Sequence, residues 1–156
     1  MIVSATGHRP PKIGGYKLPN PTYIKICQKT EQILKELNPT KCISGFALGF
    51  DSYFANVVLK LGIPLVAAVP FLGQEKAWPE KSQKLYYSLL KRASEVIVIS
   101  KGEYSPKMMQ IRNEWMVDNS QIVLACFDGS KGGTYNCIQY ATLKDKKIIY
   151  INPKDF

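Results

Sequence analysis

Six short apolar runs are spaced along the whole chain, and they constrain the fold more than any other feature of the sequence. Each is rich in Val and Ile, and none alternates strictly between apolar and polar residues. Continuous apolar runs of this length are typical of parallel strands that are buried on both faces of a sheet. The predicted strands are residues 1–6, 41–45, 63–70, 95–100, 122–127 and 146–151.

Amphipathic segments separate these runs. Residues 22–37 place Ile26, Ile33, Leu34 and Leu37 on one helical face, as a helix packed against a sheet requires. Further helices are predicted over 52–61, from first-turn prolines at 79 and 106, and over 134–144. Strict alternation of strand and helix predicts an α/β fold, here a Rossmann-like three-layer α/β/α sandwich with a mainly parallel sheet.

A single domain spanning residues 1–156 is expected, because 156 residues with 46% hydrophobic content suffice for one core. We predict the strand order 3-2-1-4-5-6, counted along the chain. In such sheets ligands bind beyond the carboxyl ends of the strands, where the strand order reverses. The loops after strands one, two, four and five would then surround one crevice.

Charge and composition narrow the classes of ligand. The formal net charge is +9, which favours anionic partners. Because the Lys and Arg residues do not form one dense cluster, we expect a small anion rather than a nucleic-acid duplex. One histidine excludes a His-rich metal site, and the four cysteines, at 27, 42, 126 and 137, form no CxxC pair. No metal, cofactor, signal segment or membrane span is expected, which favours a cytoplasmic protein.

The loop after the fifth strand, "DGSKGGT", is the first candidate binding element. Its glycines allow the backbone to approach a ligand closely, and N–H groups at the following helix start would bind phosphate. A tight turn with a Thr cap is the structural alternative. The loop is neither a Walker loop nor a GxGxxG fingerprint. Its candidate ligand-binding residues are Asp128, Gly129, Ser130, Gly132, Gly133 and Thr134.

Three other loops supply the rest of the candidate site. An arginine donates two parallel hydrogen bonds to a phosphate, and an aspartate at a helix start accepts hydrogen bonds from ribose hydroxyls. The ordinary alternatives are a surface arginine, a helix-start preference and a charged residue paired within the core. The candidates are Gly7, His8 and Arg9 in "TGHRP", Gly45, Gly49 and Asp51 in "SGFALGFD", and Arg112 and Asn113 in "MQIRN".

Four motifs in this order, "TGHRP", "SGFALGFD", "RNEWMVD" and "DGSKGGTYNCIQYA", resemble the YpsA/YoqJ-like branch of the SLOG superfamily. That superfamily also contains the Lonely-guy phosphoribohydrolases and DprA/Smf. The resemblance spans nearly the whole chain and implies a Rossmann-like fold that binds nucleotides or nucleotide-derived ligands. It also implies that Gly132, Gly133 and Thr134 hold a phosphate, with Gly7, Arg9, Gly45 and Asp51 on the opposite wall.

One departure from the Lonely-guy pattern bears on catalysis. Those enzymes have a glutamate in Gly-Thr-x-x-Glu, where this chain has Cys137, and an Arg-Lys pair where this chain has Arg112 and Asn113. Without that carboxylate, hydrolysis of an N-glycosidic bond lacks its expected group. Arg112, Asp51 and Cys137 remain the candidate catalytic residues. A thiol nucleophile at Cys137 and a cysteine that only packs beneath the loop are the two alternatives.

Three functions are therefore compared. The first is a binding protein that senses or sequesters a nucleotide-derived signal such as ADP-ribose, including as a phage or prophage counter-defence protein. The second is a nucleotide hydrolase or N-glycosidase, and the third is single-stranded DNA binding as in DprA/Smf. We favour the first, without enzymatic activity, and expect a homo-oligomer with no membrane contact.

Overall fold

The sheet is a single layer of six parallel strands. The computed structural model describes residues 1–102 and 104–156. The strands are β1 (Ile2–Gly7), β2 (Lys41–Ser44), β3 (Leu65–Val69), β4 (Glu95–Val98), β5 (Ile122–Cys126) and β6 (Lys147–Ile151). They are paired in the order β4-β3-β2-β1-β5-β6, and every pairing is parallel. The chain therefore starts in the middle of the sheet and builds outward in both directions.

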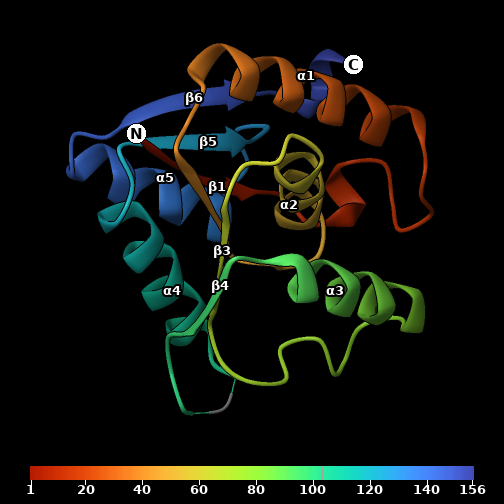
Figure 1. Ribbon diagram of the computed structural model, residues 1–156, viewed down its shortest axis with the longest axis vertical. Helices are drawn as coiled ribbons and strands as arrows, with labels where there is room; N and C mark the ends of the chain where they lie inside the picture. Colours follow the sequence, from red (N-terminus) through yellow and green to blue (C-terminus); the bar gives the residue numbers. More distant parts are fainter. Residues whose placement is uncertain (103) are drawn as a thin grey trace.

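Among the described residues, five helices cover the two faces of the sheet. They are α1 (Pro21–Leu37), α2 (Phe50–Lys60), α3 (Glu80–Arg92), α4 (Pro106–Asp118) and α5 (Gly133–Leu143), and short 3-10 turns lie at Pro10–Lys12 and Pro153–Asp155. α2 contacts both α1 and α3, and α4 contacts α5. In Figure 1, α4 and α5 lie to the left of the sheet while α2 and α3 lie to the right. The predicted three-layer α/β/α class is confirmed.

The fourth strand does not lie where the sequence predicted it. We expected residues 95–100 beside the first strand, but β4 pairs with β3 and, in the described part of the chain, forms an edge of the sheet. Val96 and Val98 are 46% and 38% exposed, a burial that suits an edge and not the centre of a sheet. An apolar run of four to six residues has the same composition at an edge as in the centre of a sheet. The sequence of this run therefore did not reveal its edge position. The strand order reverses between β1 and β5.

The helix starts differ in how their N–H groups are satisfied. Asn20 caps α1 by accepting from the Tyr23 N–H at 2.9 Å, and Ser105 caps α4 by accepting from the Met108 N–H at 3.1 Å. The N-caps of α2 and α5 are Gly49 and Gly132, which have no side chain to accept such a bond. Both of these helices begin next to the carboxyl end of β1 or β5, so the uncapped starts lie at the reversal of strand order.

Candidate functional site

A cavity of about 530 Å³ opens at the carboxyl ends of β1 and β5. Parallel sheets bind ligands at this position, where the crossovers on either side leave in opposite directions. Its lining comes from the loops after β1, β2 and β5, from the first turns of α2 and α5, and from the first two turns of α4. The lining residues are Thr6, Gly7, His8, Arg9, Pro11, Lys12, Ala47, Asp51, Tyr104, Pro106, Met109, Gln110, Arg112, Asn113, Lys131, Gly132, Gly133, Thr134 and Asn136.

The glycine-rich loop between β5 and α5 presents open backbone to this cavity. A Cβ added at Gly132 or Gly133 would meet no atom within 4 Å. Gly132 has a φ of 150°, a conformation that side chains disfavour. In the described part of the chain, the N–H groups of Gly133 and Thr134 have no protein acceptor. Unpaired N–H groups at the start of an 11-residue helix form an anion site when they face open space.

Arg112 projects from α4 into the inner part of the cavity and is only 3% exposed. Its Nη1 donates to the Gly45 carbonyl at 2.7 Å and to the Ala68 carbonyl at 3.2 Å, and its Nε donates to Asn113 Oδ1 at 2.9 Å. The three acceptors lie in the loop after β2, in β3 and in α4 itself. Together they hold the planar guanidinium in place. The guanidinium is therefore a fixed donor rather than a flexible one.

Asp51 lies beside Arg112 and is 7% exposed. Its Oδ2 accepts from the Ala47 N–H at 3.2 Å. Burial raises the pKa of the Asp51 carboxyl and lowers the pKa of the Arg112 guanidinium, in each case against the opposing effect of the other charge. For both groups the effect of burial on the pKa is thus larger than the opposing effect of the neighbouring charge.

Gly45 has no side chain because the two charged groups occupy that space. A Cβ there would lie 2.6 Å from Arg112 Nη1 and 2.8 Å from Asp51 Oδ2. Gly49 is equally constrained, since its Cβ would lie 2.4 Å from the His8 carbonyl. The two glycines of "SGFALGFD" therefore leave room for the neighbouring side chains and backbone of the site. Neither glycine lines the cavity.

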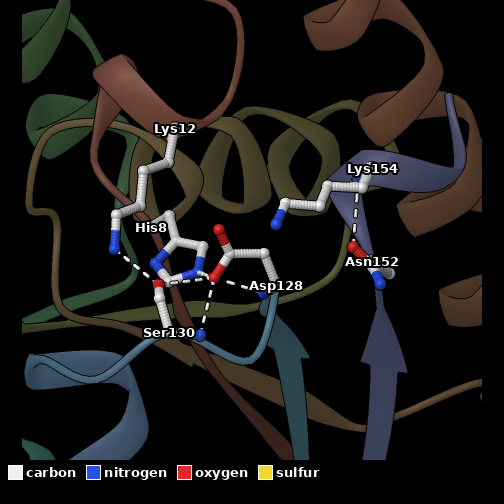
Figure 2. A network of polar contacts seen from close by, with 6 residues as sticks. All are labelled: His8, Lys12, Asp128, Ser130, Asn152 and Lys154. Carbon is white, nitrogen blue, oxygen red and sulfur yellow. Dashed lines mark hydrogen bonds and ion pairs between the residues drawn. The ribbon is translucent and has the colours of Figure 1, made fainter.

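A polar network joins the loop after β1 to the glycine-rich loop (Figure 2). His8 Nε2 lies 2.8 Å from Asp128 Oδ1, and the Asp128 N–H lies 3.1 Å from the same nitrogen. Ser130 donates to Asp128 Oδ1 through its N–H at 2.9 Å and its hydroxyl at 2.5 Å, and Lys12 Nζ donates to the Ser130 hydroxyl at 2.5 Å. Lys154 extends toward this carboxylate from the C-terminal turn.

The charges in this network depend on burial and on the hydrogen bonds. Burial lowers the pKa of His8, and the attraction of Asp128 only partly offsets this effect. Hydrogen bonds from Ser130 hold the pKa of Asp128 well below its usual range, with a smaller contribution from His8. One ring nitrogen donates to the carboxylate when it carries a proton and accepts from the backbone N–H when it does not. The network ties the glycine-rich loop to β1 in both cases.

The rim of the cavity is positively charged. Arg9, Lys12 and Lys131 are exposed there, while Asp51 is the one acidic residue among the lining residues given above. Within residues 1–102 and 104–156, no group of three or more His, Cys, Asp and Glu side chains is placed to hold a metal ion. The basic rim therefore complements an anion.

The structure brings nine of the fourteen predicted ligand-binding residues into the lining of one cavity: Gly7, His8, Arg9, Asp51, Arg112, Asn113, Gly132, Gly133 and Thr134. The other five, Gly45, Gly49, Asp128, Gly129 and Ser130, lie outside the lining. Sequence reasoning missed Lys12, Tyr104, Met109, Gln110, Lys131 and Asn136, all of which lie in or next to the same loops. Their residue types are common on surfaces, so only their position in the fold marks them.

Cys137 lies beneath the loop and not in the cavity lining. It is 3% exposed and packs with Val117, Val123 and Ala141. Burial raises the pKa of its thiol to about 11, so it is protonated near neutral pH and a weak nucleophile. This environment matches the alternative in which the cysteine only packs.

The fold and this crevice define a Rossmann-like α/β protein with a cavity at the reversal of strand order, and comparison with known sequences identifies the family. The YpsA model, that of the YspA SLOG family, matches residues 3–155. The chain belongs to this family. It is 35% identical over 142 residues to the SPbeta prophage-derived protein YoqJ of Bacillus subtilis, covering 78% of this chain and 83% of that protein. It is 29% identical over 157 residues to a UPF0398 protein of Bacillus thuringiensis, covering 94% and 85%.

Solved structures share the fold at low sequence identity. DNA processing protein A from Streptococcus pneumoniae matches with a TM-score of 0.70 and 18% identity over 96% of this chain, which is half of that protein. A molybdenum cofactor binding protein from Rippkaea orientalis matches with a TM-score of 0.61 and 17% identity, covering 96% of this chain and 74% of that one. The described helices include none that is long and apolar enough to cross a membrane.

Proposed function

We propose that this protein binds a nucleotide-derived small molecule in the crevice and holds its phosphate at the start of α5, without cleaving it. The observation that carries the proposal is the glycine-rich loop, whose unpaired N–H groups at Gly133 and Thr134 face a cavity with a basic rim. An uncapped helix start favours an anion through its oriented donors and its dipole.

The size and the lining of the cavity support a small ligand. A volume of about 530 Å³ lies in the range that suits cofactors and nucleotides, about 300–1,000 Å³. The exposed cations Arg9, Lys12 and Lys131 surround this cavity instead of forming a long track. Arg9 and Lys131 come from different loops, so they reach the phosphate region from two sides.

Binding without turnover is supported by the residues around the phosphate cradle. The position that carries a glutamate in the Lonely-guy pattern holds Cys137, which is buried and has a raised pKa. We propose that the protein senses or sequesters its ligand. The prophage origin of the relative YoqJ supports a role in which a phage-encoded protein withholds such a signal from the host.

The test is native mass spectrometry of the protein purified from cells, followed by heat release and identification of any bound nucleotide. Isothermal titration with AMP and ADP-ribose then measures affinity, with Gly133→Asp as the blocking variant. The added carboxylate would occupy open space in front of the cradle, so binding should be lost while circular dichroism shows an intact fold. Undiminished binding by Gly133→Asp would contradict the proposal, as would tight binding of single-stranded DNA but of neither nucleotide.

A further inference from the structure

Arg112 and Asp51 are two oppositely charged side chains that lie next to each other without forming an ion pair. Both line the cavity, and both are more than nine-tenths buried, at 3% and 7% exposed. Neither takes part in any of the ion pairs found among the described residues. Buried charges normally gain their stabilisation from a direct partner, so each retains unused hydrogen-bonding capacity.

The unused capacity of Arg112 is a pair of donors. A guanidinium carries five N–H groups. Those of Nη1 and Nε are taken by the carbonyls of Gly45 and Ala68 and by Asn113 Oδ1. In the described part of the chain, Nη2 has no acceptor. It is also absent from the fully enclosed polar atoms without a partner, which are Tyr53 Oη and Gln74 Oε1, so Nη2 keeps some exposed surface on a residue that lines the cavity.

The unused capacity of Asp51 is an acceptor. Its Oδ2 accepts from the Ala47 N–H at 3.2 Å, while Oδ1 receives no hydrogen bond from residues 1–102 or 104–156. This oxygen is likewise not among the enclosed atoms. The pKa of Asp51 is raised by burial, which means that its ionised form would gain from a further donor. Both residues line the cavity, and both approach the same point above Gly45, so the cavity offers a free donor and a free acceptor on neighbouring side chains.

From this pairing we infer that the floor of the cavity binds the vicinal diol of a ribose, which deepens the proposed function and rests on it. Adjacent hydroxyls both donate and accept, so one satisfies Asp51 Oδ1 while the other accepts from Arg112 Nη2. The ligand class is a ribonucleotide with free 2′- and 3′-hydroxyls. Loss of either hydroxyl therefore removes one of these two charge-assisted hydrogen bonds.

The rim of the cavity, rather than its floor, suits the nucleobase. Tyr104 is 66% exposed and lines the cavity with Pro106 and Met109. These side chains supply the flat or apolar surfaces on which a base packs. The floor beside Asp51 has Thr6, Gly7 and Ala47 instead. We therefore place the ribose at the buried charges of Asp51 and Arg112, and the base nearer the exposed Tyr104 at the rim.

The test compares AMP, 2′-deoxy-AMP and inorganic phosphate by isothermal titration at one ionic strength. A missing hydroxyl leaves a buried charged group unpaired, and such losses weaken binding by a factor of about 10 or more. AMP is therefore expected to bind at least about 10-fold more tightly than 2′-deoxy-AMP. The wild-type protein suffices for this comparison, so the result does not depend on whether a variant folds.

The variant Asp51→Asn locates the effect. It should reduce the preference for AMP over 2′-deoxy-AMP to less than about 3-fold, because the charge-assisted bond is lost. Arg92→Ala, an exposed change in the last turn of α3, should leave the preference intact. Equal wild-type affinities for AMP and 2′-deoxy-AMP would overturn the diol site while leaving phosphate binding in place. If AMP and phosphate both failed to bind, the proposed function would fall as well.

Discussion

Arg112 Nη1 donates a 2.7 Å hydrogen bond to the carbonyl of Gly45, a residue 67 positions earlier in the chain. This bond joins α4 to the loop after β2 and fixes the guanidinium in the floor of the cavity. It depends on the absence of a side chain at residue 45, because a Cβ would lie 2.6 Å from the same nitrogen.

Gly45→Ala should therefore displace Arg112 and weaken both folding and binding. Overpacking of a buried site lowers the free energy of unfolding by about 1–3 kcal/mol. Gly133→Ala is the matched control for stability, since it adds the same methyl group where no atom lies within 4 Å. Urea unfolding of the two variants measures the difference. Equal unfolding free energies for the two variants would contradict this prediction, because they would show that Arg112 can move aside without destabilising the fold.

Arg9→Ala should weaken AMP binding by about 1.5–3 kcal/mol, the usual range for a hydrogen bond to a charged group. Arg9 is exposed on the cavity rim, so its removal should leave the unfolding free energy almost unchanged. Arg92→Ala removes the same charge from α3, away from the cavity. Calorimetric titration of both variants with AMP separates the effect of a direct contact from the effect of net charge. Equal losses of affinity in the two variants would show that Arg9 does not contact the ligand.

Stability should fall as the pH is lowered from about 7.5 to 5.5. The folded-state pKa of His8 is depressed from 6.5 by burial, so the unfolded chain binds more protons in this window. The free energy of unfolding then decreases as pH falls through 6.5 toward the folded value, by at most about 1.4 kcal/mol per pH unit. Urea titrations at pH 7.5, 6.5 and 5.5 measure the slope.

His8→Gln is the control for this pH dependence, because His8 is the one histidine of the chain. The variant should flatten the profile between pH 7.5 and 5.5. The lowered pKa of Asp128 acts only as pH falls below the ordinary aspartate value of about 3.8, so it lies outside the window. An identical slope in both proteins would assign the effect elsewhere.

The cysteines should react slowly with iodoacetamide in the folded protein at pH 7.5. Burial raises the pKa of Cys27 and Cys137 to about 11 and the pKa of Cys42 and Cys126 to about 12. Mass spectrometry should show Cys27 labelled first, because it is the partly exposed thiol. Cys137→Ala should retain AMP binding within about 3-fold. Rapid labelling of Cys137, or release of adenine from AMP that this variant abolishes, would restore it as a nucleophile.

Most of the candidate site was predictable because its residues follow strand ends. Gly7 and Arg9 follow the first apolar run, Gly133 ends the loop that follows the fifth, and parallel strands bring their carboxyl ends to one edge. Lys12 and Asn136 were not predictable in this way. Lys12 enters the site through a 3-10 turn and a bond to Ser130, and neither feature has a distinctive sequence pattern.

The sequence by itself determined the layers of this protein, since buried parallel strands and amphipathic helices each have a periodicity that local residues express. It also determined the glycine-rich loop before α5, because Gly132 requires a backbone conformation that side chains disfavour. Only the tertiary structure decided that β4 lies at an edge and that Arg112 meets Asp51 over Gly45. Both outcomes depend on packing between residues far apart in the chain, which no local pattern encodes.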